Sequence, residues 1–134
     1  MSRRLGAAAC LVLVSIVPGC GGGGSAGRTI NADDLRDCLG THGASFTAES
    51  GGASFVPFAV DFRATIGHTS IAVSTSANAA TARRAAADAR SALGSVGVPQ
   101  GSGNVIQHEN AVVIFDPAPS PPARAAVNAC LTER

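Results

Sequence analysis

Two segments in the middle of the chain, 58–66 and 69–75, alternate between apolar and polar positions. Strict alternation is typical of strands with one buried face. The intervening Gly67-His68 suits a two-residue type II′ turn, because glycine accepts the positive φ of the first position. We therefore expect a hairpin with the register Ala64–Ile71 and Phe62–Val73.

Three segments space their apolar residues as one face of a helix. The first is capped by Asn31 and stops at Gly40, and the second runs from Ser76 or Asn78 to Leu93, before Gly94. The third is capped by Ser120, with Pro121 at its first position. The expected inward stripes are Leu35, Cys38 and Leu39, then Ala82, Ala86, Ala89 and Leu93, then Ala123, Val127, Cys130 and Leu131.

A second hairpin is expected from 104–108 and 111–116, which flank Glu109-Asn110. The continuous apolar run at 112–115 predicts a central strand. Segment 41–57 is rich in Gly, Ser and Ala and is interpreted as a long loop with room for a short edge strand. The pattern predicts an α+β fold in the order α-ββ-α-ββ-α. Its four-stranded antiparallel sheet would carry helices mainly on one face.

The first 19 residues have the pattern of an export signal. A basic start is followed by an uncharged run from Leu5 to Val17 and then by small residues. This run is too short for a transmembrane helix, which needs about 20 apolar residues. Gly21 to Gly27 is nearly pure Gly and Ser and predicts a flexible tether of about 15 Å. We therefore expect a signal peptide at 1–19, a tether segment at 20–28 and one folded domain at 29–134.

Val17-Pro18-Gly19-Cys20 resembles the lipobox of bacterial lipoprotein precursors, although Pro18 stands where that family usually has a small or aliphatic residue. The resemblance covers only the first 20 or so residues. It implies that Cys20 becomes the mature N-terminus and carries a diacylglyceryl group, with further acylation such as palmitate. Two acyl chains anchor a protein stably, so the resemblance implies a cell-membrane location facing outside the cytoplasm. The alternative is ordinary secretion after cleavage behind Ala26.

The three other cysteines belong to two different segments of the chain. Cys10 lies in the signal peptide, which leaves Cys38 and Cys130 in the folded domain. Exported proteins fold in an oxidising compartment, so these two predict a disulfide. The alternative is two separately buried free thiols. A metal site is not expected, because His42 lies beyond Gly40, where the helix carrying Cys38 is expected to end.

The composition and net charge of the chain bear on whether its partner is a nucleic acid. The chain has 134 residues, 46% hydrophobic and 14% charged, and a formal net charge of +1. Loss of Arg3 and Arg4 with the signal peptide leaves eight Arg against nine acidic residues, a net charge of −1. A nucleic-acid partner is therefore not expected. From Arg28 onward only 23 positions are Val, Ile, Leu or Phe. Such a lean core makes a disulfide important for stability.

No catalytic residue, metal or cofactor is indicated. His42, His68 and His108 are expected at or near loops, and nothing in their spacing makes them converge. Asp61 and Glu109, the acids nearest to two of them, are expected on exposed positions, where a general acid–base pair lacks a pocket. The charged residues of the second helix, Arg83, Arg84, Asp88 and Arg90, are interpreted as a solvated face.

Three classes of function therefore remain open. The first is a lipid-anchored binding or interaction module for a protein or small-molecule ligand, using an open sheet face with Arg63, Thr65 and Ser74. The second is a small exported enzyme or metal-handling protein that uses the His residues. The third is a structural component of the envelope. The separation of the imidazoles distinguishes the second class, because metal–nitrogen bonds are only about 2 Å long.

Overall fold

The computed structural model describes residues 28–47, 59–99 and 101–133. Its helices are α1 (Ala32–Thr41), α2 (Ala79–Ser95) and α3 (Pro121–Thr132). Its strands are β1 (Ser45–Phe46), β2 (Phe62–Ile66), β3 (Thr69–Thr75), β4 (Val105–His108) and β5 (Ala111–Asp116). The fold is α+β, as expected. The expected signal peptide, Cys20 and the tether up to Gly27 lie outside the described residues. None of the described helices has the length and apolarity needed to cross a membrane.

The sheet has five strands in the described ranges rather than the four expected. All neighbours pair antiparallel in the order β1-β2-β3-β5-β4. The additional strand, β1, comes from the segment interpreted as a loop with room for an edge strand, and it places Phe46 opposite Ala64. The Phe46 ring packs edge-on against Phe62, with centroids 5.9 Å apart. A two-residue strand is too short to show an alternating pattern, so it could not be predicted from the sequence. The contact between Phe46 and Phe62 contributes to its position beside β2.

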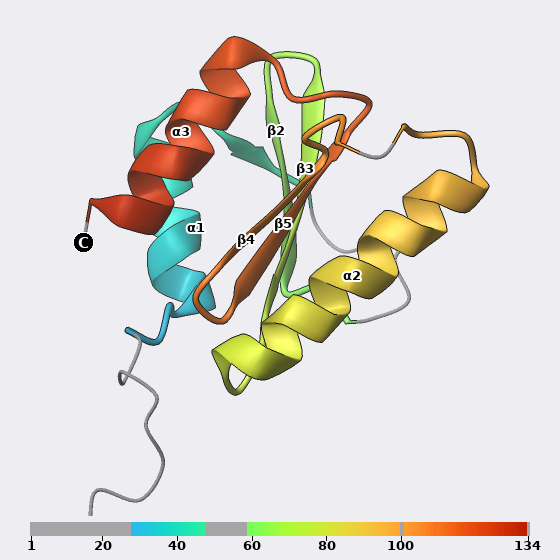
Figure 1. Ribbon diagram of the computed structural model, residues 1–134. Helices are drawn as coiled ribbons and strands as arrows, with labels where there is room; N and C mark the ends of the chain where they lie inside the picture. The colour runs from blue at the N-terminus through green and yellow to red at the C-terminus, as the bar shows by residue number, and fades with distance from the viewer. Residues whose placement is uncertain (1–27, 48–58, 100, 134) are drawn as a thin grey trace, which may run out of the picture.

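The helices cover both faces of the sheet, so the expectation of helices mainly on one face was incomplete. In Figure 1, α1 and α3 lie on one side of the sheet and α2 lies on the other. The reason is that the central strands are apolar on both faces. Ile71, Val73, Val113 and Phe115 pack in the cluster with α1 and α3, whereas Ala72, Val112 and Ile114 pack against α2.

The expected hairpin registers are confirmed. Phe62 pairs with Val73 and Ala64 with Ile71, and Gly67 has a φ of 61° in the connecting turn. The second hairpin joins β4 and β5 through Glu109 and Asn110, and β5 lies between β3 and β4. Its central position explains why Val112 to Phe115 form an unbroken apolar run, since both of its faces are covered.

The helix starts are as expected, but two helix ends are not. Asn31, Asn78 and Ser120 each accept a hydrogen bond from a backbone N–H of the first turn. Helix α1 continues past Gly40 and α2 continues past Gly94. The glycines that follow the two ends are Gly43 and Gly97, with φ of 85° and 89°. In each case hydrogen bonds run back to the last turn in the Schellman pattern, which requires a left-handed residue.

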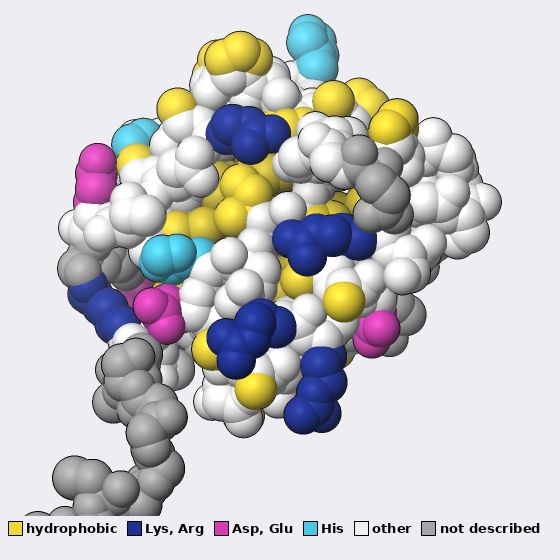
Figure 2. Space-filling model, viewed as in Figure 1, with side chains coloured by type: hydrophobic (Ala, Val, Ile, Leu, Met, Phe, Trp, Pro, Cys, Tyr) yellow, Lys and Arg dark blue, Asp and Glu magenta, His cyan; other side chains and the backbone are white. Residues whose placement is uncertain are grey.

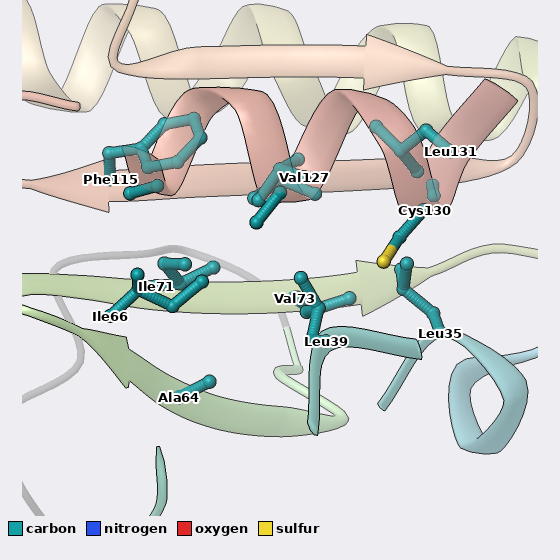
Figure 3. Packing of buried hydrophobic residues seen from close by; sticks show 14 of the residues in the cluster. Leu35, Leu39, Ala64, Ile66, Ile71, Val73, Phe115, Val127, Cys130 and Leu131 are labelled. Carbon is teal, nitrogen blue, oxygen red and sulfur yellow. The ribbon is translucent and has the colours of Figure 1, made fainter. Parts of the chain in front are cut away.

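The main core lies between the sheet and the α1–α3 layer, as Figure 3 shows. Leu35, Leu39, Val73, Phe115 and Val127 are each 1% exposed or less. The helical stripes expected from the sequence are confirmed, except that Cys38 and Leu93 are half-buried. The second cluster is smaller, because α2 presents only alanines to the sheet over most of its length.

Candidate functional site

A groove runs between the sheet and the C-terminal end of α2. It encloses about 400 Å³, within the range of small-molecule pockets. We call it the α2 groove. The residues that define it here are Arg63, Thr65, Ser70, Leu93, Val96 and Asp116.

The floor of the α2 groove follows from the strand register. Thr65 pairs with Ser70, and Ser70 pairs with Asp116, so these three residues form one polar row across β2, β3 and β5. The next row, toward the middle of the sheet, places Arg63 beside Ala72 and Ile114. The floor therefore changes from polar at the hairpin end to mainly apolar further in.

The wall of the α2 groove is apolar. Leu93 and Val96 come from the end of α2, and Val98 follows the Schellman turn. Val96 is 62% exposed, whereas large apolar side chains elsewhere in the described residues are buried or half-buried. An apolar wall that faces a short polar row can hold a molecule with an apolar body and a polar end.

The surface expected from the sequence is only partly brought together. Arg63 and Thr65 line the α2 groove, but Ser74 is 7% exposed. The rest of the supposedly open sheet face is covered by α2. Sequence reasoning missed Val96 and Val98, because it ended the helix before Gly94 and so assigned no role to the residues after it.

The three histidines do not form one site. His68 precedes β3, while His108 ends β4 and pairs with Ala111, which in turn pairs with Thr75 at the far end of β3. Seven residues of β3 separate the two positions by about 20 Å. Figure 2 likewise shows the His side chains apart from one another. The hypothesis of a metal held by all three histidines is therefore wrong.

The Asp61 carboxylate is hydrogen-bonded to β3 and not to one of these histidines. The Asp61 carboxylate accepts hydrogen bonds from the Thr75 backbone N–H at 2.6 Å and from its hydroxyl at 2.7 Å. Asp61 precedes β2 and His68 follows it, so the strand separates the two residues. The Asp61 side chain therefore fastens the segment before β2 to the end of β3. The helix residues Arg83, Arg84, Asp88 and Arg90 are exposed, as expected.

The two cysteines of the domain form a disulfide. Cys38 in α1 is joined to Cys130 in α3, with Cα atoms 5.7 Å apart and a sequence separation of 92. Cys130 is 2% exposed, and Cys38 is half-buried. The bridge therefore connects the two helices of one layer, as the cysteine count predicts.

A histidine accompanies this disulfide, contrary to the sequence-based expectation. One ring nitrogen of His42 and the two sulfur atoms all lie within 4.8 Å of one another. Because α1 extends to Thr41, His42 is its C-cap residue and stands four positions after Cys38, on the same face. The helix itself ends at Thr41 and so does not include His42, but the expected end at Gly40 was too early, and the cap position brings His42 beside the disulfide.

The described residues thus offer two candidate sites on opposite faces of the sheet. The α2 groove has the volume and mixed lining of a ligand site, and the cluster of Cys38, Cys130 and His42 has soft ligand atoms close together. Comparison with known proteins adds no identity to these sites. No protein-family model matches the chain, and searches of curated proteins and of solved structures give no significant match.

Proposed function

We propose that the chain is a lipid-anchored binding module on the outer face of the cell membrane, and that the α2 groove holds its ligand. The observation that carries the proposal is the groove itself, a mixed apolar and polar hollow of about 400 Å³. The membrane anchor is inferred from the Val17-Pro18-Gly19-Cys20 pattern and the Gly-rich tether that follows it.

The position of the groove relative to the tether suits display on a membrane. The Ile30 N–H donates to the Asn110 side chain at 2.6 Å, which ties the start of the domain to the β4–β5 turn. The polar row of the groove lies at the other end of β5, at Asp116. Five steps along this strand correspond to about 17 Å. A tether that leaves near Asn110 therefore leaves the groove facing away from the membrane.

The lining indicates the class of ligand. We expect a small molecule whose apolar part lies against Leu93 and Val96, while its polar groups meet the row of Thr65, Ser70 and Asp116. Such a ligand need not be charged, because Arg63 and Asp116 bring charges of both signs to the groove. A large protein partner would instead need a flat surface of about 800 Å² on this side.

The anchor is tested by comparing two cysteine substitutions in the full-length precursor. Cys20→Ser removes the proposed lipid site, and Cys10→Ser is the matched control within the expected signal peptide. We expect the wild type and Cys10→Ser in the membrane fraction, with an intact mass for a diacylated chain that begins at Cys20. Cys20→Ser should lose both properties. A soluble wild-type product that begins at Gly27 would refute the anchor and favour secretion.

The groove is tested by filling it. Ser70→Phe places a ring on the floor at an exposed strand position, where an aromatic residue is well tolerated. Ser91→Phe adds the same ring on the exposed face of α2, outside the groove lining, as the control. The probe is the apolar dye anilinonaphthalene sulfonate, followed by its fluorescence. We expect Ser70→Phe to abolish the wild-type signal while Ser91→Phe retains it. Equal binding by all three proteins would exclude the groove as the ligand site.

A further inference from the structure

We infer that Cys38, Cys130 and His42 form a zinc-binding site when the disulfide is reduced. The three side chains supply two thiolate sulfurs and one imidazole nitrogen, which are the ligand atoms that Zn²⁺ prefers. Their ligand atoms already lie within 4.8 Å of one another, from the ends of two different helices. The same residues would thus alternate between a covalent bridge and a metal bridge.

The ligand distances fit a tetrahedral ion after a small rearrangement. Zn–S bonds of about 2.3 Å and Zn–N bonds of about 2.0 Å place two sulfurs about 3.8 Å apart and each sulfur about 3.5 Å from the nitrogen. The His42 nitrogen is within 4.8 Å of both sulfurs, so it needs to approach by at most about 1.3 Å. Once the bond between them is reduced, the Cys38 and Cys130 sulfurs can move apart by side-chain rotation.

The surroundings favour a cation. Cys38 belongs to the last turn of α1, which His42 caps, and Cys130 belongs to the last turn of α3. The carbonyl end of a helix carries partial negative charge, so two such ends meet at the cluster. The three residues range from buried Cys130 through half-buried Cys38 to exposed His42. The ion would therefore have protein on one side and a fourth coordination position open to water on the other.

The chemistry requires a reductant and releases protons. A dithiol donates two electrons, the bond between the Cys38 and Cys130 sulfurs breaks, and the dithiol becomes a disulfide in its turn. Two thiols then form in the protein. When Zn²⁺ binds, both thiols lose their protons to solvent and His42 coordinates as neutral imidazole. In the reverse direction a disulfide accepts two electrons from the two thiolates and takes up two protons to become a dithiol, while the Cys38–Cys130 bond re-forms and Zn²⁺ is released.

The site is separate from the proposed ligand groove. The cysteines lie in the α1–α3 layer, on the other face of the sheet from α2. Figure 3 shows the Cys130 sulfur beside Leu35 and Leu131 at one end of this layer. A change in zinc binding therefore reports on the cluster without depending on what occupies the groove.

The first test measures zinc affinity as a function of redox state. The full-length chain carries Cys10→Ser and Cys20→Ser so that only the domain thiols remain. After anaerobic reduction and removal of the reductant, Zn²⁺ is titrated in competition with a chromophoric chelator. We expect one tight site in the reduced protein, and only weak background binding in the oxidised protein. Reduced protein that binds zinc no more tightly than oxidised protein would overturn the proposal.

The second test assigns the third ligand. His42→Ala removes the proposed imidazole, and His68→Ala removes an exposed histidine from the β2–β3 turn as the control. We expect His42→Ala to weaken zinc binding by more than the roughly 10- to 100-fold that loss of an outer-shell partner costs a metal site. His68→Ala should have no effect. Equal affinities for the two variants would show that the cysteines alone bind the ion, and would overturn the three-ligand site.

A direct measurement covers the case in which a variant or the reduced chain folds poorly. X-ray absorption at the zinc edge of the reduced, loaded protein should give two sulfurs and one imidazole nitrogen, with a further light atom. Four sulfurs, from zinc shared between two chains, would overturn the proposal, as would a shell of oxygens and nitrogens alone. In the supporting case, far-ultraviolet circular dichroism should show native helix content in the zinc-loaded reduced protein.

Discussion

Asn110 joins three parts of the chain that are distant in sequence. Its side chain accepts a hydrogen bond from the Ile30 N–H at 2.6 Å and donates to the Ile30 carbonyl at 3.0 Å and the Ser76 carbonyl at 2.9 Å. The residue is 4% exposed. One amide at the β4–β5 turn thus holds the segments that lead into α1 and α2. We predict that Asn110→Ala is one of the most destabilising polar substitutions in the domain.

The expected loss follows from the three hydrogen bonds. A typical protein hydrogen bond contributes about 1 kcal/mol net, and an orphaned buried group costs about 1–3 kcal/mol. Ile30 is half-buried, so water can partly solvate the Ile30 N–H and carbonyl groups that lose their Asn110 partner. We therefore expect the free energy of unfolding to fall by about 3 kcal/mol. At roughly 4 °C per kcal/mol for a domain of this size, the melting temperature should drop by about 12 °C.

The assay is equilibrium urea unfolding of the oxidised protein, with three variants compared. Asn110→Asp keeps the size and the Oδ1 acceptor but replaces the donor with an oxygen that faces two carbonyls, so we expect a loss at least as large as for Ala. Asn128→Ala changes an exposed asparagine of α3 and should cost under about 0.5 kcal/mol. A loss below 1 kcal/mol for both Asn110 variants would refute the view that this amide holds the two segments.

Three further predictions concern stability measured by the same method. Replacing both cysteines of the disulfide by Ala should cost up to about 4.6 kcal/mol, the loop-closure value for a separation of 92 residues; a loss below 1 kcal/mol would contradict it. Gly40→Ala should stabilise by about 0.5–1 kcal/mol because Gly40 is inside α1 with room for a Cβ, whereas Gly43→Ala should destabilise by about 1 kcal/mol at its φ of 85°; the same sign for both would disprove the reassigned helix end. Ala86→Leu should cost about 1–3 kcal/mol by forcing α2 off the sheet, while exposed Ala87→Leu should be nearly neutral; similar values would show that α2 packs loosely.

The hairpins could be predicted from sequence because two independent signals agree in them. The alternation around Ile71 and Val73 sets which side chains are buried, and the turn at Gly67 sets the pairing; a one-residue slip would turn the apolar side chains of one strand to the other face. The helix caps at Asn31 and Asn78 could also be predicted from the sequence. A side chain that accepts hydrogen bonds, placed just before a segment with helical apolar spacing, is typical of an N-cap.

The ends of α1 and α2, and the position of α2 on the opposite face of the sheet, could not be predicted from the sequence. A glycine stops a helix only where the chain turns left-handed, and Gly40 and Gly43 are equally good candidates from sequence. The choice is made by tertiary contacts, including the Ala44 N–H that bonds to the Leu39 carbonyl. The error had consequences for function, because one extra half-turn of α1 places His42 beside the disulfide, and the extension of α2 builds the groove wall.

The two faces of the sheet are held by different kinds of side chain, and this difference bears on how the groove can adapt. The α1–α3 face buries Phe115, Leu35 and Val127 and adds the disulfide. The α2 face instead buries a stripe of alanines, Ala82, Ala86 and Ala89. At about 0.8 kcal/mol per buried methylene, an alanine contributes far less than a leucine, so α2 shifts at lower energetic cost than α1 or α3. The groove floor belongs to β2, β3 and β5, whose other face packs in the main core. We therefore expect the groove to adapt to a ligand by movement of its wall, where Val96 is exposed at the end of α2.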